Sequence, residues 1–388
     1  MKNKWGNKPK IMFYVGYSKK PWNPSNWTRE GIGGSEYCVI KLSEKLAERG
    51  WEVWVVGEVK SCHVKGVTYL STEQILNKGN ERGTHAIAFS KFDWVIGVNY
   101  IHFLKALDDN DISYYSSAFW MHNEYFHDYY KGERLENADE ILVDERIDHI
   151  ICVSEWQREY IKNQFKKALG NSNRDLSTYI QVLNNAIDPT DWEHCVFPKN
   201  KHSFVYTSAT DRGLDKVLKM WPRIKQMLPG ATLNIAAPPY SVDWGYDIDK
   251  IMQLQDVWWH GNLPPKKLYD LISRSEYWLY PSKYLETYCI TALEMMMGGV
   301  KILSTNTGNL NDLLNRRGVI VDSGLDDQAI EDVFITAIAR NNGSCHDDKK
   351  FHYYWFANTM RNKIWVQNEN WDVRCDEWEN VLQLDGFQ

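Results

Sequence analysis

The sequence predicts an α/β protein with two Rossmann-like domains, each built on a parallel sheet. Short apolar segments alternate with helical patterns along both halves of the chain, which is typical of open parallel sheets. The 388 residues are enough for two domains of ordinary size. A polar, proline-containing segment at residues 196–203 lies between the halves and is typical of a linker.

The composition narrows the function classes. A formal net charge of −6 gives no sign of a nucleic-acid partner. The seven cysteines are scattered and contain no C-x-x-C pair, which favours reduced thiols in a cytosol-like compartment. No apolar run is long enough to span a membrane or to form a signal-peptide core. We therefore expect a cytoplasmic protein without a nucleic-acid partner.

The first half opens with a strand–loop–helix–strand pattern. Residues 10–16 and 51–57 are predicted strands, and Ser35 is the expected N-cap of the helix between them. Gly33 and Gly34 stand at the start of this helix, where the backbone can approach an anion. The alternative is a tight turn that needs glycine for its conformation alone.

Three further strands are predicted in the first half, at residues 93–97, 117–121 and 149–153. His122 directly follows the second of these strands, at the edge of a parallel sheet where ligands bind. It is either a ligand contact or an ordinary loop histidine. His122 and His127 lack the His-Glu-x-x-His spacing, so we expect no metal site here.

The second half repeats the same plan. Strands are predicted at residues 204–207 and 231–236, with a helix at 216–227 between them. Arg212 lies in the loop before this helix, where a guanidinium can neutralise a diphosphate or simply be solvated.

Tryptophans mark the later part of the chain. Trp258 and Trp259 are expected in the sheet core rather than as a stacking platform for a base. Residues 351–382 are predicted to be helical, with three tryptophans about two turns apart that we expect to pack against other elements.

The most informative stretch is residues 281–304. Glu286 follows a predicted strand at 277–280, and Glu294 comes seven residues later in a helix expected to begin near Thr287. The start of a helix offers backbone N–H groups and a partial positive charge that suit a diphosphate. A carboxylate farther along can accept paired hydrogen bonds from the vicinal diol of a ribose. The alternative is two solvated glutamates on an amphipathic helix.

The residues around these glutamates resemble the signature of one enzyme family. Pro-Ser at 281–282, Ala-Leu-Glu at 292–294, Gly-Gly-Val at 298–300 and Ser-Thr-Asn-Thr-Gly at 304–308 resemble retaining glycosyltransferases of the GT-B fold, family four (glycosyl transferases group 1). Gly-Gly-Ser-Glu at 33–36, Trp-Met-His-Asn at 120–123 and Arg-Gly-Leu at 212–214 resemble further landmarks of that family.

Two positions depart from the family pattern. Ala186 stands where a glycine is usual, and residues 207–209 lack the first of two basic residues. Lys283 is the cation expected to compensate for the second departure.

The resemblance implies an architecture in which two Rossmann-like domains face each other across a cleft. Residues 1–197 would form the acceptor-side domain and residues 203–365 the domain that binds the nucleotide sugar. The helix in residues 366–388 would cross back to the first domain.

The resemblance also implies roles for individual residues. His122 and Glu286 would orient the donor sugar, and Arg212 would stabilise the leaving diphosphate, so these three form the expected catalytic set. Glu294 would hold the ribose of the donor. The other expected donor-binding residues are Gly33, Gly34, Lys283, Thr287, Tyr288, Cys289 and Ile290.

The function implied is transfer of a hexose from a nucleotide-sugar donor to a hydroxyl of a glycan, lipid or protein-linked acceptor. Anomeric configuration would be retained, and no metal or other cofactor would be needed. The alternatives are a non-catalytic glycan-binding protein and a phosphorylase or epimerase of the same fold. We expect the acceptor near a long loop at residues 17–32, which is either a peripheral membrane contact or a solvated loop.

Overall fold

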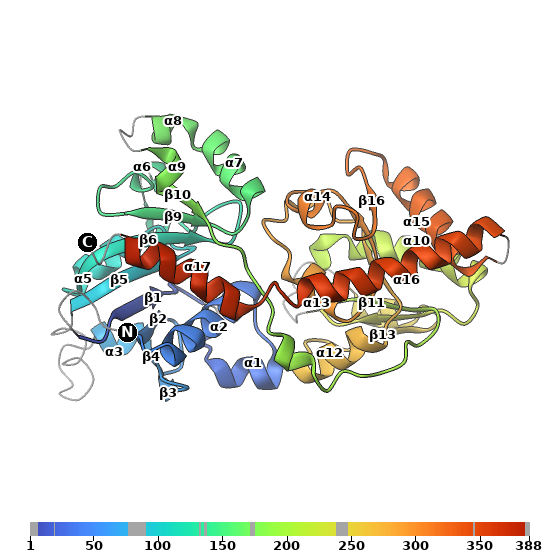
Figure 1. The fold of residues 1–388 in the computed structure, drawn as a ribbon, viewed down its shortest axis with the longest axis horizontal. Helices are drawn as coiled ribbons and strands as arrows, with labels where there is room; N and C mark the ends of the chain where they lie inside the picture. Colours follow the sequence, from blue (N-terminus) through green and yellow to red (C-terminus); the bar gives the residue numbers. More distant parts are fainter. Residues whose placement is uncertain are drawn as a thin grey trace. The chain divides into compact units, whose positions relative to one another are not determined.

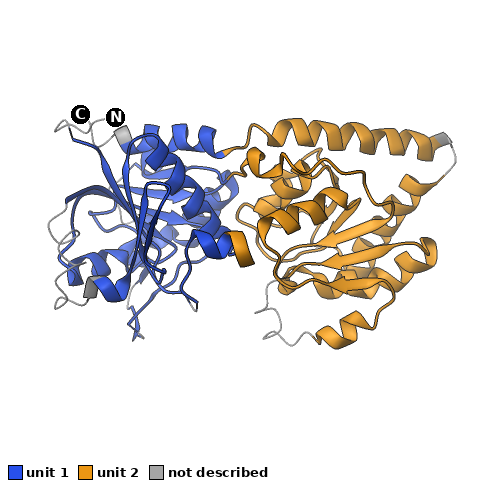
Figure 2. Ribbon diagram, turned by 90° about the horizontal axis from the view of Figure 1, so that it is seen from below, with its two compact units in different colours: residues 1–27, 32–185, 371–388 blue, residues 28–31, 186–370 orange. Residues whose placement is uncertain are grey.

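The computed structural model describes residues 7–18, 20–76, 91–131, 133–135, 138–170, 175–237, 247–343 and 346–384. The chain forms two compact units, each built around its own parallel sheet (Figures 1 and 2). Unit 1 contains residues 1–27, 32–185 and 371–388, and unit 2 contains residues 28–31 and 186–370.

Unit 1 holds an eight-stranded sheet in its described part, with the order β10-β9-β6-β5-β1-β2-β4-β3. All neighbouring strands pair in parallel except β3 and β4, which are antiparallel. The strands are β1 (Lys10–Tyr14), β2 (Glu52–Gly57), β3 (Cys62–Val64), β4 (Val67–Ser71), β5 (Lys91–Val98), β6 (Ser113–Met121), β9 (His149–Cys152) and β10 (Ile180–Val182). A separate two-stranded ladder joins β7 (Tyr129–Tyr130) and β8 (Glu133–Arg134).

The predicted strands of the first half are all present. Ile11, Met12 and Phe13 in β1 are fully buried, as expected for a central strand of a parallel sheet that is covered on both faces. The helices that connect the strands are α2 (Gly34–Glu48), α3 (Thr72–Leu76), α5 (Phe103–Asp109), α6 (Ala138–Ile141), α7 (Glu155–Gln164), α8 (Lys166–Gly170) and α9 (Leu176–Tyr179).

The start of α2 differs from the prediction. Gly33, not Ser35, is the N-cap residue, and its extended backbone carries no capping side chain. Glu36 instead folds back toward Gly33, so closely that an added Cβ there would overlap its carboxylate. This is the arrangement in which an acidic residue in the first turn reaches back toward the cap position.

The predicted loop at residues 17–32 is wrong in its second half, because helix α1 (Pro24–Glu30) forms there. Asn23 precedes the helix, and its side chain accepts a hydrogen bond from the backbone N–H of Ser25 (3.0 Å). Trp22 and Trp27 are only 5% and 9% exposed, so burial of their indole rings accounts for the ordered segment.

Helix α17 (Trp371–Leu384) groups with unit 1 although it ends the chain, which confirms the predicted return of the last helix. Trp378 is fully buried and packs edge-on against Trp120, with ring centroids 4.8 Å apart. The carboxylate of Glu379 accepts hydrogen bonds from the indole of Trp51 (2.9 Å) and the guanidinium of Arg49 (2.9 Å).

Unit 2 holds a fully parallel sheet of six strands in its described part, with the order β13-β12-β11-β14-β15-β16. The strands are β11 (Ser203–Tyr206), β12 (Thr232–Ile235), β13 (Val257–Trp259), β14 (Tyr277–Tyr280), β15 (Lys301–Thr305) and β16 (Val319–Val321). The helices are α10 (Leu214–Met227), α11 (Ile248–Met252), α12 (Pro265–Arg274), α13 (Ile290–Met297), α14 (Leu310–Leu313), α15 (Asp327–Asn342) and α16 (His346–Val366), and the 3-10 turns are η1 (Pro189–Trp192) and η2 (Thr210–Arg212).

The expected burial of both tryptophans in β13 is wrong. Trp258 is 52% exposed and Trp259 is half-buried, in a strand at the edge of the sheet. None of the helices in the described residues combines the length and the apolar character that a membrane crossing needs.

The long segment of unit 2 begins at Ala186, before the polar segment at residues 196–203. The backbone N–H of Ile187 donates to the carbonyl of Glu369 (3.1 Å). Trp192 stacks on Tyr269 of α12, with ring centroids 4.2 Å apart. These two contacts hold residues 187–192 against the rest of unit 2.

Candidate functional site

The loop after β14 carries most of the predicted donor-binding residues. It is held from the side by the segment that follows β15. The hydroxyl of Thr307 donates to the carbonyl of Ser282 (2.9 Å), and the backbone N–H of Asn309 donates to the carbonyl of Glu286 (2.7 Å). Because β14 and β15 are parallel neighbours, both segments leave the sheet at the same edge. The loop is therefore held at two points, Ser282 and Glu286.

Gly308 permits this close packing. It has a φ of +63°, and an added Cβ would lie 2.7 Å from the backbone nitrogen of Glu286. Any side chain at this position would meet both a strained backbone and a direct overlap.

Glu286 is half-buried at the end of β14. The hydroxyl of Tyr280, the last residue of the strand, donates a hydrogen bond to its carboxylate. Tyr280 is almost fully buried, and burial, with the nearby Glu286 charge, raises the pKa of its phenol. The phenol therefore remains a hydrogen-bond donor that orients the carboxylate.

Arg212 ends the short turn η2 and approaches the same loop. The next residue, Gly213, has a φ of +94°, and an added Cβ would lie 2.7 Å from the carbonyl oxygen of Pro281. Glycine at this position lets η2 pack against the start of the loop. The guanidinium then lies over the ring of Tyr284.

The electrostatic setting of Arg212 favours its charged form. Burial acts to lower the pKa of the guanidinium, but the carboxylate of Glu286, followed by Tyr284 and Asp211, outweighs burial and raises it. One guanidinium nitrogen, Nη1, is buried and has no hydrogen-bond partner among the described residues. A buried N–H donor without a partner marks a place for a ligand acceptor.

Helix α13 begins at Ile290 and not near Thr287, as had been predicted. Cys289, the residue before the helix, has a left-handed backbone with a φ of 72°, which prevents the helix from extending toward Thr287. Burial raises the pKa of the Cys289 thiol well above its ordinary value, so it stays protonated. The amide groups at this helix start are those that the sequence predicted to face an anion.

Glu294 lies in the second turn of α13. No hydrogen bond or ion pair holds its half-buried carboxylate within the described part of the chain. Burial raises the pKa of this group to about 8. A partly buried carboxylate with a strongly raised pKa and no protein partner is typical of a functional position.

Lys283 is engaged elsewhere than expected. Its ammonium forms an ion pair with Asp327 (3.1 Å), and Lys216 of α10 forms a second with the same oxygen (3.1 Å). Hydrogen bonds from Lys283 and then Lys216 lower the pKa of Asp327. Lys216 is the better buried of the two lysines, with 16% of its side chain exposed against 51% for Lys283. Lys216 was not among the predicted site residues, although it follows Arg212 by only four positions.

The remaining predicted residues lie in unit 1. The backbone N–H of His122, just after β6, donates to the side chain of Asn99 (2.7 Å). The amide of Asn99 in turn donates to the hydroxyl of Ser35 (3.3 Å), so it connects the end of β6 with the start of α2. Asn99 was not among the predicted site residues. Its backbone is left-handed, with a φ of 60°, which the sequence does not reveal.

Burial shifts the pKa of two groups near the end of β6 and the start of α2. It lowers the pKa of His122 to about 3, so the imidazole is neutral. Burial also raises the pKa of Glu36, next to the exposed Gly33 and Gly34. The structure thus brings His122 and the two glycines together through Asn99, and it brings Arg212 and Glu286 together in unit 2.

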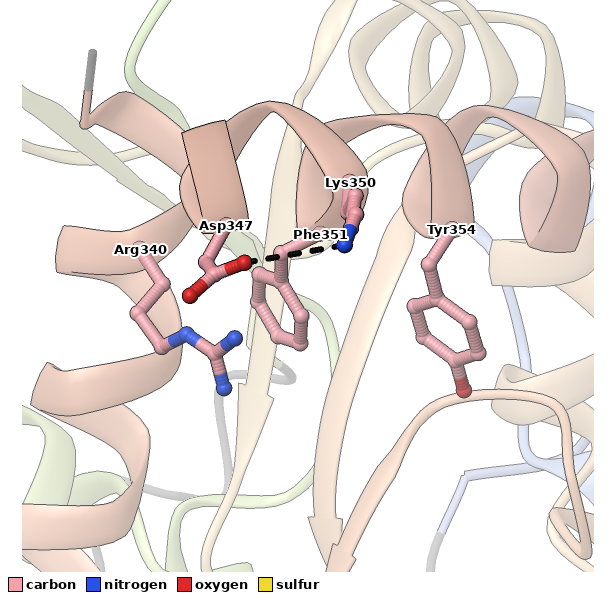
Figure 3. Close-up of a pocket in the computed structure, with 5 residues that line it drawn as sticks. All are labelled: Arg340, Asp347, Lys350, Phe351 and Tyr354. Carbon is pink, nitrogen blue, oxygen red and sulfur yellow. Dashed lines mark ion pairs between the residues drawn. The ribbon is translucent and has the colours of Figure 1, made fainter. Parts of the chain in front are cut away.

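A separate cavity lies between α15 and α16 in unit 2, with a volume of about 330 Å³ (Figure 3). Its lining residues are Arg340, Asp347, Lys350, Phe351 and Tyr354. The guanidinium of Arg340 lies 4.6 Å from the ring centroid of Phe351. None of the residues predicted to bind the donor lines this cavity.

Comparisons with known proteins agree with this architecture. A family model described as "Glycosyl transferases group 1" matches residues 196–352. A glycogen synthase from Mycobacterium tuberculosis is 28% identical over 138 residues, which cover 34% of this chain and 33% of the relative. The matched part therefore spans about a third of that curated relative.

Solved structures match over nearly the whole chain. Sucrose-phosphate synthase from Thermosynechococcus elongatus has a TM-score of 0.68 at 12% identity, covering 97% of this chain and 99% of its own. Anabaena HepE in complex with UDP-glucose has a TM-score of 0.66 at 13% identity, with the same coverage. The catalytic domain of Arabidopsis thaliana starch synthase IV, bound to ADP and acarbose, has a TM-score of 0.65 at 12% identity, also with this coverage.

Two α/β units, each with a mainly parallel sheet, and a last helix α17 that belongs to unit 1 are features of the GT-B fold. This confirms the predicted fold class. Residues 196–352 match the glycosyl transferases group 1 family model, the family that the sequence motifs resemble.

Proposed function

We propose that this protein is a glycosyltransferase that moves a hexose from a nucleotide-sugar donor to a hydroxyl of a glycan, lipid or protein-linked acceptor. Configuration at the anomeric carbon is retained, and the transfer step uses no bound metal. The observation that supports this most directly is the carboxylate of Glu294, which has a raised pKa and no protein partner within the described chain. A ribose diol supplies the two hydrogen bonds that such a group lacks.

The residues of unit 2 then divide the donor between them. Glu294 binds the ribose, and the amides at the start of α13 face the diphosphate. Arg212 supplies a positive charge and an unused N–H donor to the same diphosphate. Glu286, oriented by Tyr280, accepts a hydrogen bond from a hydroxyl of the transferred sugar.

Breaking the bond between the sugar and the diphosphate places negative charge on the leaving group. Arg212 and the helix amides stabilise this charge more strongly in the transition state than in the bound donor, which is the requirement for acceleration. The acceptor hydroxyl attacks from the face that the diphosphate leaves and transfers its proton to that diphosphate. His122, which is neutral, donates or accepts a hydrogen bond with the sugar rather than a charge.

Related structures narrow the donors worth testing. HepE was solved with UDP-glucose and starch synthase IV with ADP, so both bases belong in a panel. Titration calorimetry with UDP-, ADP- and GDP-sugars should identify one donor that binds the wild-type protein. Glu294→Ala should weaken its binding at least about tenfold.

The matched control is Glu331→Ala. Glu331 lies in the same unit, is also poorly exposed and forms an ion pair with Arg223 (3.2 Å). The control should bind the donor as the wild type does. Equal donor affinity in Glu294→Ala and wild type would rule out the proposed ribose contact. Conversion of the donor without any acceptor product would favour an epimerase or a phosphorylase.

A further inference from the structure

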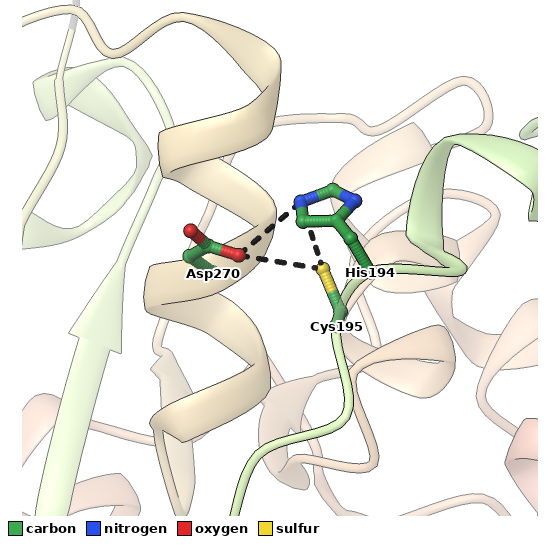
Figure 4. A group of neighbouring side chains, drawn as sticks. All are labelled: His194, Cys195 and Asp270. Carbon is green, nitrogen blue, oxygen red and sulfur yellow. Dashed lines mark hydrogen bonds and ion pairs between the residues drawn. The ribbon is translucent and has the colours of Figure 1, made fainter.

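Three side chains with metal-binding atoms meet on unit 2, apart from the residues assigned to the donor (Figure 4). His194 and Cys195 follow the turn η1, and Asp270 projects from the middle of α12. Their nearest ligand atoms all lie within 4.8 Å of one another. Among the described residues, this is the one group of three potential metal ligands that lie so close together.

The distances match the separations that a tetrahedral ion imposes. Zn²⁺ binds nitrogen and oxygen at about 2.0–2.2 Å and sulfur at about 2.3 Å, so tetrahedral ligand atoms lie about 3.4–3.6 Å apart. Here His194 Nε2 lies 3.4 Å from Cys195 Sγ and 3.2 Å from Asp270 Oδ1. Cys195 Sγ lies 3.7 Å from Asp270 Oδ1. Each separation is within about 0.2 Å of the tetrahedral range.

The backbone around these ligands is fixed. The N–H of Cys195 donates to the carbonyl of Trp192 (2.9 Å), which closes the turn before the ligands. Trp192 itself stacks on Tyr269, the residue before Asp270. The two segments that supply the ligands are therefore held against each other by an aromatic contact, and the site needs little rearrangement to accept an ion.

The exposure of the ligands leaves one side of the site open. Cys195 is 7% exposed, whereas about a third of the His194 and Asp270 side chains is accessible. The sulfur thus lies on the buried side of the group, and the histidine and the aspartate lie on its accessible side.

We propose that His194, Cys195 and Asp270 bind one Zn²⁺ ion, with water as the fourth ligand. The set of one imidazole, one thiolate and one carboxylate suits zinc, because a thiolate disfavours Mg²⁺ and Ca²⁺, and zinc accepts all three donor types. The ion connects the segment after η1 to α12 and so stabilises the start of unit 2. It takes no part in sugar transfer.

Zinc binding exchanges protons for the metal. In the absence of the ion, the same three atoms are joined by contacts of 3.2–3.7 Å. Zn²⁺ displaces the thiol proton and binds the thiolate, with no change in oxidation state.

The test uses the full chain, reduced and stripped of metal. Zn²⁺ is titrated in competition with a chromophoric chelator, and Co²⁺ is used as a spectroscopic substitute. The wild type should bind one Zn²⁺ per chain, and Co²⁺ should give the charge-transfer band of a thiolate ligand. Cys195→Ser should weaken zinc binding by more than the roughly 10–100-fold that loss of an outer-shell partner costs.

Two further variants make the result specific. Asp270→Asn should also weaken zinc binding while keeping the size of the side chain. Cys62→Ser is the matched control, because Cys62 is a partly exposed thiol in unit 1, and it should bind zinc as the wild type does. Circular dichroism checks that each variant is folded.

The proposal is overturned if the wild type fails to hold zinc against the chelator, or if Cys195→Ser holds it equally well. Should Cys195→Ser not fold, the Co²⁺ spectrum of the wild type decides, since no thiolate band means no cysteine ligand. These outcomes are independent of the donor, because none of the three ligands is assigned to nucleotide-sugar binding.

Discussion

The phenol of Tyr280 donates a hydrogen bond to the carboxylate of Glu286. The strand β14 and the loop that follows it are thereby connected through a side chain as well as through the backbone. Because Tyr280 is buried, this contact helps to fix the direction of the Glu286 carboxylate in a half-exposed loop.

Tyr280→Phe should therefore lower turnover more than it lowers donor affinity. The ring still fills its place in the core, and the lost hydrogen bond should reduce the free energy of unfolding by about 0.5–1.5 kcal/mol. The matched control is Tyr277→Phe in the same strand, where the hydroxyl accepts hydrogen bonds from the side chains of Asn341 and Asn342. The control should lose at least as much stability as Tyr280→Phe, and only Tyr280→Phe should lose turnover. Equal kinetic constants in the two variants would remove Glu286 from the mechanism.

Arg212→Ala should lower turnover by roughly 10²–10³-fold, the usual cost of removing one donor that stabilises transition-state charge. Arg212→Lys should recover only part of this loss, because a lysine cannot reproduce the planar guanidinium over Tyr284. Steady-state kinetics with the donor identified by calorimetry provide the measurement.

Arg223→Ala is the control for the loss of a positive charge in unit 2. Arg223 is 44% exposed and pairs with Asp332 and Glu331 on the surface. A surface ion pair of this kind contributes less than about 1 kcal/mol, so the control should retain wild-type turnover. A loss in Arg223→Ala as large as that in Arg212→Ala would mean that net charge, not position, explains the effect.

The sequence was sufficient for the strands and the family motifs because they depend on local patterns. Buried parallel strands appear as continuous apolar runs, and β1 and β14 lie where these runs predicted them. The predicted start of α13 was wrong because the helix begins after the left-handed backbone of Cys289. A left-handed conformation is rare for a residue other than glycine and cannot be predicted from a cysteine in the sequence.

Contacts between distant residues could not be derived in the same way. Lys283 was expected near the diphosphate, but Asp327, far along the chain, pairs with it. Asn99 connects Ser35 with His122 through its side chain, and a single asparagine after a strand carries no pattern of its own. Such partners depend on the order of the strands in the sheet, which sequence periodicity does not determine.

Gly308→Ala tests whether the loop position matters as the structure indicates. The new methyl group would overlap the backbone of Glu286 in a left-handed conformation, so the loop must move. The free energy of unfolding should fall by about 1–3 kcal/mol, and donor affinity should fall with it. Gly230→Ala is the control, because a Cβ at Gly230 meets no atom within 4 Å. Denaturant unfolding and calorimetry measure the two effects. Wild-type donor affinity in Gly308→Ala would show that the position of this loop does not matter for the donor.

A change in pH should have opposite effects on the two contributions of Glu294, to stability and to donor binding. Burial raises the pKa of its carboxyl to about 8 in the folded chain, whereas an exposed glutamate titrates near 4.3. Between these pH values the folded protein keeps a proton that the unfolded chain releases. The contribution of Glu294 to stability is thus complete below about pH 4.3 and declines as the pH rises toward 8.

Glu294→Gln has no carboxyl proton and lacks this decline. The variant and the wild type should have similar free energies of unfolding near pH 4.5. At pH 8 the variant should be more stable by at least about 1.4 kcal/mol, the equivalent of one pKa unit. Urea unfolding at the two pH values, without donor, provides the measurement. A stability difference that is the same at both pH values would contradict the raised pKa.

Donor binding should show the reverse dependence. Ribose hydroxyls donate to the ionised carboxylate, so wild-type affinity for the donor should increase between pH 6 and pH 9 as Glu294 loses its proton. Binding near pH 7 should release a proton, which calorimetry detects as a heat that changes with the ionisation enthalpy of the buffer. Glu294→Gln should bind the donor weakly at every pH and release no proton. A variant that is more stable at pH 8 yet binds the donor poorly would identify Glu294 as a residue kept for ligand binding at a cost in stability.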